Sequence, residues 1–144
     1  MPTNENFNWP VRVYYEDTDA GGIVFYANYL KYFERARTEW LRSLGYSQHV
    51  LTETLGLLFV VKAVAIEYHA SAKLDDELKL VVAVERLGGA SMKIRQEVWR
   101  VEAGQDTLLS DGTVTIVCVD KAISRPCPIP GEIRQKINSA IQTE

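Results

Sequence analysis

The sequence has little cysteine, no long apolar run and no excess of basic side chains, and each shortage excludes a class of protein. Cysteine occurs only at Cys118 and Cys127, too few for a metal cluster, and we expect two reduced thiols. The apolar runs fall well short of the ~20 residues that a membrane span needs. The 16 basic and 19 acidic residues give a net charge of −3, which argues against a nucleic-acid partner.

The length and composition are those of one ordinary globular domain. At roughly 100–200 residues per domain, the 144 residues are expected to form a single domain over 1–144. Apolar residues make up 47% and charged residues 24% of the chain, a balance that builds a core without a disulfide or a metal. Residues 1–8 contain neither the basic nor the apolar region of a signal peptide, so we expect a cytoplasmic protein.

In the first half of the chain, apolar residues first recur at every second position and then at every third or fourth position. Alternation over 9–16 predicts a strand, which ends at the turn-forming residues 17–22. Apolar residues then recur at helical spacing from Leu30 to Leu44, which predicts an amphipathic helix with Asn28 as its N-cap and Gly45 just beyond its end. A second, short helix is expected after residue 47.

The rest of the chain alternates mostly as strands. Strands are predicted over 59–70, 77–86, 92–101 and 107–120, followed by a terminal helix over 132–142. Sequential strands with short connections pair antiparallel, which predicts an α+β fold with the long helix across the concave face of a five-stranded sheet. Because the strand over 59–70 is apolar on both faces, we expect a homo-oligomer to cover it.

The junction between the first strand and the long helix holds the best candidates for chemistry. Asp17, Asp19 and a Gly-Gly pair lie immediately before the helix, whose first amides have no internal partner and carry partial positive charge. Such amides polarise a carbonyl oxygen, and a carboxylate nearby can attack the carbonyl carbon or deprotonate a water. The alternative is structural, because turns and caps also use aspartate and glycine. A metal at residues 17–19 is not expected, since the spacing places no third ligand.

Residues 11–39 have the sequence VRVYYEDTDAGGIVFYANYLKYFERARTE. This segment strongly resembles the hotdog-fold acyl-CoA thioesterases, and most closely their Tol–Pal-associated (YbgC-type) branch, related to 4-hydroxybenzoyl-CoA thioesterase. The resemblance implies a long helix wrapped by an antiparallel sheet, assembled into dimers or dimers of dimers. It implies thioester hydrolysis without a metal or organic cofactor, CoA being part of the substrate. It also implies that Asp19 is the catalytic carboxylate and that the backbone amide of Tyr26 polarises the thioester carbonyl, with Asp17 structural.

This chain departs from the family pattern at two places. Family members often carry histidine or proline where this chain has Ala27, which cannot transfer a proton. The 4-hydroxybenzoyl-CoA enzyme contacts the nucleotide phosphates through basic residues where this chain has glycine and alanine at 88–90. Lys93, Arg95 and Arg125 are candidate replacements, so the CoA-binding residues stay open.

Other polar and aromatic residues have simpler interpretations. Tyr29, close to Tyr26, is a candidate for lining an acyl pocket. His69 is interpreted as a packed or capping residue, His49 as solvated, and Glu34 as ion-paired or solvated. Two alternatives to acyl-CoA hydrolysis are kept: an enzyme acting on acyl carrier protein, and a non-catalytic acyl-binding protein of the cell-envelope machinery.

Overall fold

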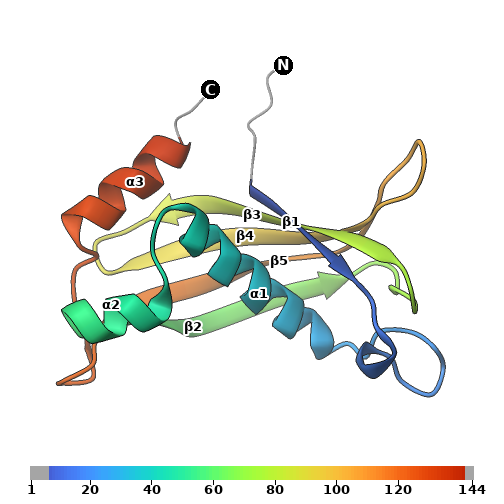
Figure 1. Cartoon of the computed structure of the whole chain (residues 1–144), viewed down its shortest axis with the longest axis horizontal. Coiled ribbons are helices and arrows are strands. Elements are labelled where there is room, and N and C mark those ends of the chain that lie inside the picture. Colours follow the sequence, from blue (N-terminus) through green and yellow to red (C-terminus); the bar gives the residue numbers. More distant parts are fainter. Residues whose placement is uncertain (1–6, 142–144) are drawn as a thin grey trace.

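The computed structural model describes residues 7–141, in which a long helix crosses one face of a curled antiparallel sheet (Figure 1). The helices are α1 (Asn28–Ser43), α2 (Gln48–Leu55) and α3 (Gly131–Ile141), with a 3-10 turn η1 (Tyr15–Asp17). The strands are β1 (Phe7–Arg12), β2 (Leu57–Tyr68), β3 (Glu77–Leu87), β4 (Ser91–Arg100), β5 (Thr107–Asp120) and β6 (Arg125–Pro126). The α+β class expected from the sequence is confirmed.

The strand order is β1-β3-β4-β5-β2, and the two-residue β6 pairs with β5 as a sixth strand that the sequence analysis did not predict. All pairs are antiparallel. The expectation that every sequential strand pairs with the next was wrong for β2, which lies beside β5 instead of β3. The connection over 69–76 is no tight hairpin and carries the chain to the other side of the sheet.

Register shifts in the ladders let the sheet curl around α1. They fall between Val61 and Ala63 in β2, between Val84 and Arg86 in β3, and between Val98 and Trp99 where β4 pairs with β5. An extra residue in one strand bends it and increases its twist. The first strand begins before residue 9 and ends earlier than predicted, because the chain leaves β1 after Arg12 and then forms η1.

The helix α1 turns its largest side chains toward the sheet. Its buried residues recur at intervals of three, four and one, as expected for one helical face: Tyr29, Tyr32, Phe33, Ala36, Trp40 and Leu41. Leu30, predicted to share this face, is exposed. Asn28 was predicted to be the N-cap but is the first residue of the helix. The N-cap is Ala27. Gly45 follows the helix with φ +100°, a conformation that suits glycine, as predicted.

A polar link in the core fixes α1 against the middle of the sheet. Gln96 of β4 is 1% exposed, and its Nε2 donates to the backbone oxygen of Phe33 at 3.0 Å. Its Oε1 accepts from Nη1 of Arg37 at 2.9 Å. Because a buried amide without partners costs about 1–3 kcal/mol, this position of the helix over β4 is strongly preferred.

The strand β2 forms one edge of the sheet and leaves apolar side chains in contact with solvent. Val60, Val61, Val64 and Tyr68 are all exposed. Residues 7–141 therefore do not supply the expected burial of both faces of this strand. Exposed apolar edges invite pairing with another chain, so a homo-oligomer stays a prediction.

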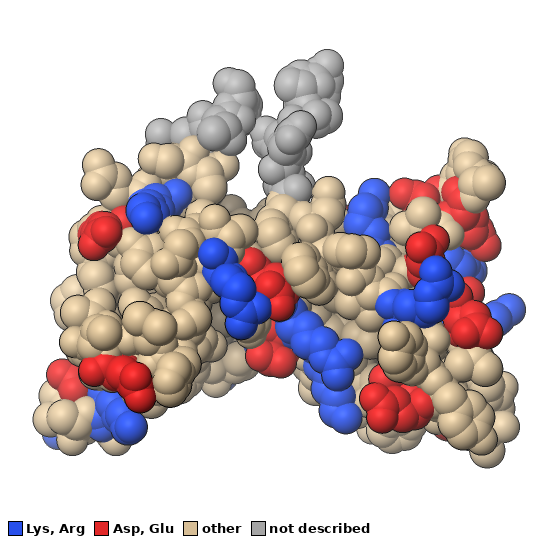
Figure 2. Space-filling view, viewed as in Figure 1, with Lys and Arg blue, Asp and Glu red and all other residues tan. Residues whose placement is uncertain are grey.

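Charges are mixed on the side of the molecule that α1 covers. Figure 2 shows lysine and arginine side chains next to aspartate and glutamate on this face. The ion pairs of the molecule include Arg42–Glu39 at 2.6 Å and Arg12–Glu77 at 3.2 Å. Within residues 7–141 no helix is both long and apolar enough to cross a membrane. Cys118 and Cys127 are free thiols, as expected.

Candidate active site

Asp19 lies in a tight turn that presents its side chain to solvent. The backbone amide of Asp19 donates to the oxygen of Ile23 at 2.9 Å, and the amide of Gly22 donates to the oxygen of Asp19 at 3.0 Å. The carboxylate accepts at Oδ1 from the amide of Gly21 at 2.8 Å. Gly22 has φ +82°, which glycine adopts at little cost. The turn therefore fixes the orientation of one exposed carboxylate.

Asp17 holds this turn to the start of α1. Its side chain is buried, and Oδ2 accepts from the amide of Tyr14 at 2.9 Å. Its backbone oxygen accepts from the amide of Phe25 at 3.2 Å and from Nδ2 of Asn28 at 2.8 Å. Burial beside Asp17 raises the pKa of Tyr32, so this neighbouring hydroxyl stays protonated. These contacts fit the structural role that was expected for Asp17.

We expect Asp17→Ala to destabilise the protein by about 1–3 kcal/mol, because it leaves the Tyr14 amide without its acceptor. Glu16→Ala is the matched control, since Glu16 is a neighbouring carboxylate that is exposed. Thermal unfolding followed by circular dichroism measures both variants. Equal melting temperatures for the two variants would contradict the structural role of Asp17.

The start of α1 offers backbone amides to the same region. The amide of Asn28 donates to the oxygen of Phe25 at 2.8 Å, and that of Tyr29 donates to the oxygen of Tyr26 at 3.3 Å. Among residues 7–141, the amides of Tyr26 and Ala27 have no backbone acceptor. Amides of this kind at a helix start bind negative charge.

A pocket of about 370 Å³ joins the turn, the helix start and the end of β2. The sequence predicted three of its lining residues as site residues, and the structure brings all three together: Asp19, Tyr26 and Tyr29. The pocket is also lined by Tyr68, His69 and Ser71, which were not predicted to lie there. Residue 68 and the connection that follows it approach α1 only because β2 pairs with β5.

Tyrosines form one wall of the pocket. The ring of Tyr68 lies 5.3 Å from that of Tyr29 and 6.2 Å from that of Tyr26, both edge-on. The hydroxyl of Tyr29 accepts from the amide of Ala72 at 3.0 Å. Burial raises the pKa of Tyr29 and that of Tyr68, so both hydroxyls stay neutral. The wall is aromatic and uncharged, a suitable surface for an acyl group.

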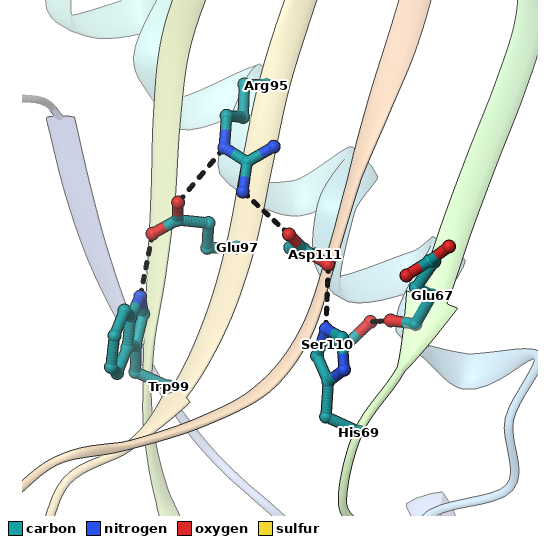
Figure 3. Close-up of polar contacts among 7 residues, drawn as sticks. All are labelled: Glu67, His69, Arg95, Glu97, Trp99, Ser110 and Asp111. Carbon is teal, nitrogen blue, oxygen red and sulfur yellow. Dashed lines mark hydrogen bonds and ion pairs between the residues drawn. The ribbon is translucent and has the colours of Figure 1, made fainter.

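His69 connects the pocket to a network of polar side chains on the sheet (Figure 3). Its Nε2 lies 2.9 Å from Oδ1 of Asp111, whose Oδ2 accepts from Nη2 of Arg95 at 2.6 Å. Arg95 and Trp99 both donate to Glu97, at 3.2 and 2.8 Å. The hydrogen bonds from His69 and Arg95 hold the pKa of Asp111 below its usual range. Of the two interpretations of His69, packed or capping, the packed one was wrong, because the side chain is 40% exposed and lines the pocket.

This network is better explained by hydrogen bonding than by metal binding. The possible ligand atoms of Glu67, His69 and Asp111 lie within 4.8 Å of one another. Both carboxylate oxygens of Asp111 are already engaged, one by His69 and one by the positive charge of Arg95. The expected absence of a metal stays a prediction.

The remaining candidates from the sequence lie elsewhere. Glu34 accepts from the hydroxyl of Thr38 at 2.8 Å and lines a separate, smaller cavity beside α2. His49 lies 3.5 Å from Glu53, in an exposed pair on α2. Lys93 lies 3.8 Å from Glu85. Arg95 belongs to the network above, so each of these two candidates for CoA binding has a carboxylate partner.

Comparison with known proteins agrees with these features. Residues 21–106 match the family model described as "Thioesterase superfamily". The acyl-CoA thioesterase YbgC of Haemophilus influenzae is 46% identical over 91% of this chain and 93% of its own length. The acyl-CoA thioester hydrolase YbgC of Escherichia coli O6:H1 is 43% identical over 88% and 92%.

Solved structures share the fold. A 1,4-dihydroxy-2-naphthoyl-CoA thioesterase from Synechocystis superposes with a TM-score of 0.82, at 22% identity, over 95% of this chain and 96% of its own. This likeness confirms the hotdog fold, in which a sheet wraps a central helix. With the family match and the close relatives over most of the chain, these findings show that the chain belongs to the thioesterase superfamily.

Proposed function

We propose that this chain hydrolyses acyl-CoA thioesters to the free acid and CoA, with Asp19 as the catalytic carboxylate. One observation carries the proposal: Asp19 lines the same pocket as Tyr26, a residue whose amide has no backbone acceptor among residues 7–141. Thioester hydrolysis needs a group that attacks or activates water and a donor for the carbonyl oxygen. The names of the YbgC relatives support CoA as the carrier of the acyl group.

The roles follow from the positions of the groups. The carbonyl oxygen of the thioester would accept a hydrogen bond from the Tyr26 amide. This hydrogen bond becomes stronger as negative charge develops on that oxygen. Asp19 would act on the carbonyl carbon, either directly or through a water molecule, and the electron pair of the broken C–S bond would leave with sulfur. The aromatic wall with Tyr29 would hold the acyl group.

A thiol-release assay tests this function. We expect turnover with at least one member of a panel of short aliphatic, long aliphatic and aromatic acyl-CoAs, each measured at several concentrations. The aromatic wall favours acyl groups with a flat or apolar body. Release no faster than in buffer for every substrate would contradict the proposal and favour a non-catalytic acyl-binding protein of the envelope machinery.

Two finer points belong to the same proposal. Acyl carrier protein presents the acyl group on the same kind of thioester, so the panel includes one acyl-carrier substrate. A basic patch would favour acyl carrier protein as the partner. The face shown in Figure 2 has mixed charge instead, so it gives no reason to prefer this protein over CoA. We also propose a homo-oligomer, supported by the exposed apolar side chains on the edge strand β2.

A further inference from the structure

We propose that His69, held by Asp111, accepts the proton of the hydrolytic water at the Asp19 pocket. This inference rests on the proposed function and adds a lining residue from another segment of the chain, just beyond the end of β2. It starts from an observation independent of Asp19: a histidine that lines the pocket is also hydrogen-bonded to a carboxylate.

The position of His69 is fixed by the backbone. Its amide donates to the oxygen of Leu109 at 2.8 Å, and the amide of Ala70 donates to the same oxygen at 3.2 Å. The ring therefore stands on a segment tied to β5. Asp111 is itself held by Arg95, as Figure 3 shows. A catalytic base needs support of this kind, because small displacements cost much of its effect.

The hydrogen bond to Asp111 selects the tautomer of the imidazole. When Nε2 carries the proton and donates to Asp111, Nδ1 presents a lone pair. Among residues 7–141, Nδ1 has no hydrogen-bond partner. A carboxylate that orients a histidine so that its second nitrogen accepts a proton is the arrangement that recurs in hydrolytic triads.

Carboxylates and one guanidinium group surround His69 on the side of the sheet. Asp111 stabilises the imidazolium that forms, and Glu67 adds a second carboxylate close to the ring. The positive charge of Arg95 opposes this stabilisation of the imidazolium, but Arg95 is also paired with the carboxylate of Glu97. The titratable groups on the pocket side are one carboxylate and three tyrosines: Asp19, Tyr26, Tyr29 and Tyr68.

The assignment of His69 leaves Asp19 to act as the nucleophile. Asp19 forms a bond to the carbonyl carbon, the C–S bond breaks, and CoA leaves as the thiolate. Water then transfers one proton to Nδ1 of His69 and attacks the mixed anhydride, which returns the Asp19 carboxylate and releases the acid. The imidazolium passes its proton to the thiolate or to solvent. The sum is one thioester and one water converted to one carboxylic acid and one thiol.

His69→Gln tests the proposal, because glutamine can still donate to Asp111 but cannot accept a proton. With the acyl-CoA that the wild-type protein hydrolyses fastest, we expect kcat to fall by about 10²–10⁴-fold. We also expect a burst of one thiol per site before slow turnover, since only the second step is impaired. We also expect the pH dependence of kcat to differ between the wild type and the variant, because the variant lacks the proton acceptor.

Two further variants separate a chemical role from a structural one. His49→Gln is the matched control, a histidine paired with a carboxylate on α2, and should keep the wild-type kcat. His69→Ala should regain turnover when imidazole is added to the buffer. The proposal is overturned if His69→Gln keeps kcat within twofold, or if kcat falls with no burst and an unchanged pH profile. Either result leaves the role of Asp19 untouched, whereas an Asp19 variant without loss would overturn the proposed function itself.

Discussion

Asp19→Asn is expected to lower kcat by about 10²–10⁴-fold with the fold preserved. Asparagine keeps a side-chain oxygen at the position of Oδ1, so the hydrogen bond from the Gly21 amide survives. It has no negative charge and is a poor nucleophile and base, so only the chemistry should be lost. Thiol release at saturating substrate measures the effect, and circular dichroism confirms the fold.

Asp120→Asn is the matched control for this substitution. Asp120 accepts at Oδ1 from the amide of Ala122 at 2.9 Å, the same contact to the residue two positions later that Asp19 makes with Gly21. Asp120 lies outside the pocket, at the far end of β5. We expect this variant to retain wild-type kcat and KM. If Asp19→Asn behaved like the control, the catalytic assignment of Asp19 would be wrong.

Gly112→Ala is expected to have the largest effect on stability, a loss of about 3 kcal/mol or more. Gly112 of β5 faces Ile66 of β2 and Gln96 of β4. A Cβ at this position would overlap the backbone oxygen of Ala65, which cannot move without separating the two strands. At roughly 2–4 °C per kcal/mol for a protein of this size, the melting temperature should fall by about 10 °C.

Gly89→Ala provides the comparison for Gly112→Ala. A Cβ at Gly89 meets no atom within 4 Å, so the same chemical change is sterically free there. We expect its melting temperature to stay within a few degrees of wild type. Urea unfolding gives the free energies of both variants. A loss of less than about 1 kcal/mol for Gly112→Ala would show that β2 adapts easily, contrary to the close approach of its backbone to β5.

Sequence patterns predicted local structure well and long-range pairing poorly. The long helix and Gly45 beyond its end were predicted because both depend on residues close in the chain. The position of β2 beside β5 depends on residues some 50 positions apart, which no local pattern reports. The start of α1 was also shifted by one residue, because the side chain of Asn28 binds the oxygen of Asp17 instead of capping the helix.

The residues of the candidate site also differ in whether a local sequence pattern could predict them. Asp19 and Tyr26 could be predicted because they are neighbours in one short motif, and the resemblance assigned their roles. His69 could not, since its approach to the pocket requires the β2–β5 register and its partner Asp111 lies 42 residues away. An isolated histidine at the end of a predicted strand carries no signal of either contact.

The buried link from Gln96 to α1 has a consequence for how this protein can diversify. The helix is anchored at Phe33, about two turns after the amide of Tyr26, by a strand that contributes nothing to the pocket. Exchanges at residue 68 can therefore reshape the aromatic wall without rotating the helix. The aromatic wall and the start of α1 are thus held by different contacts, so the wall can change while the amide of Tyr26 keeps its place.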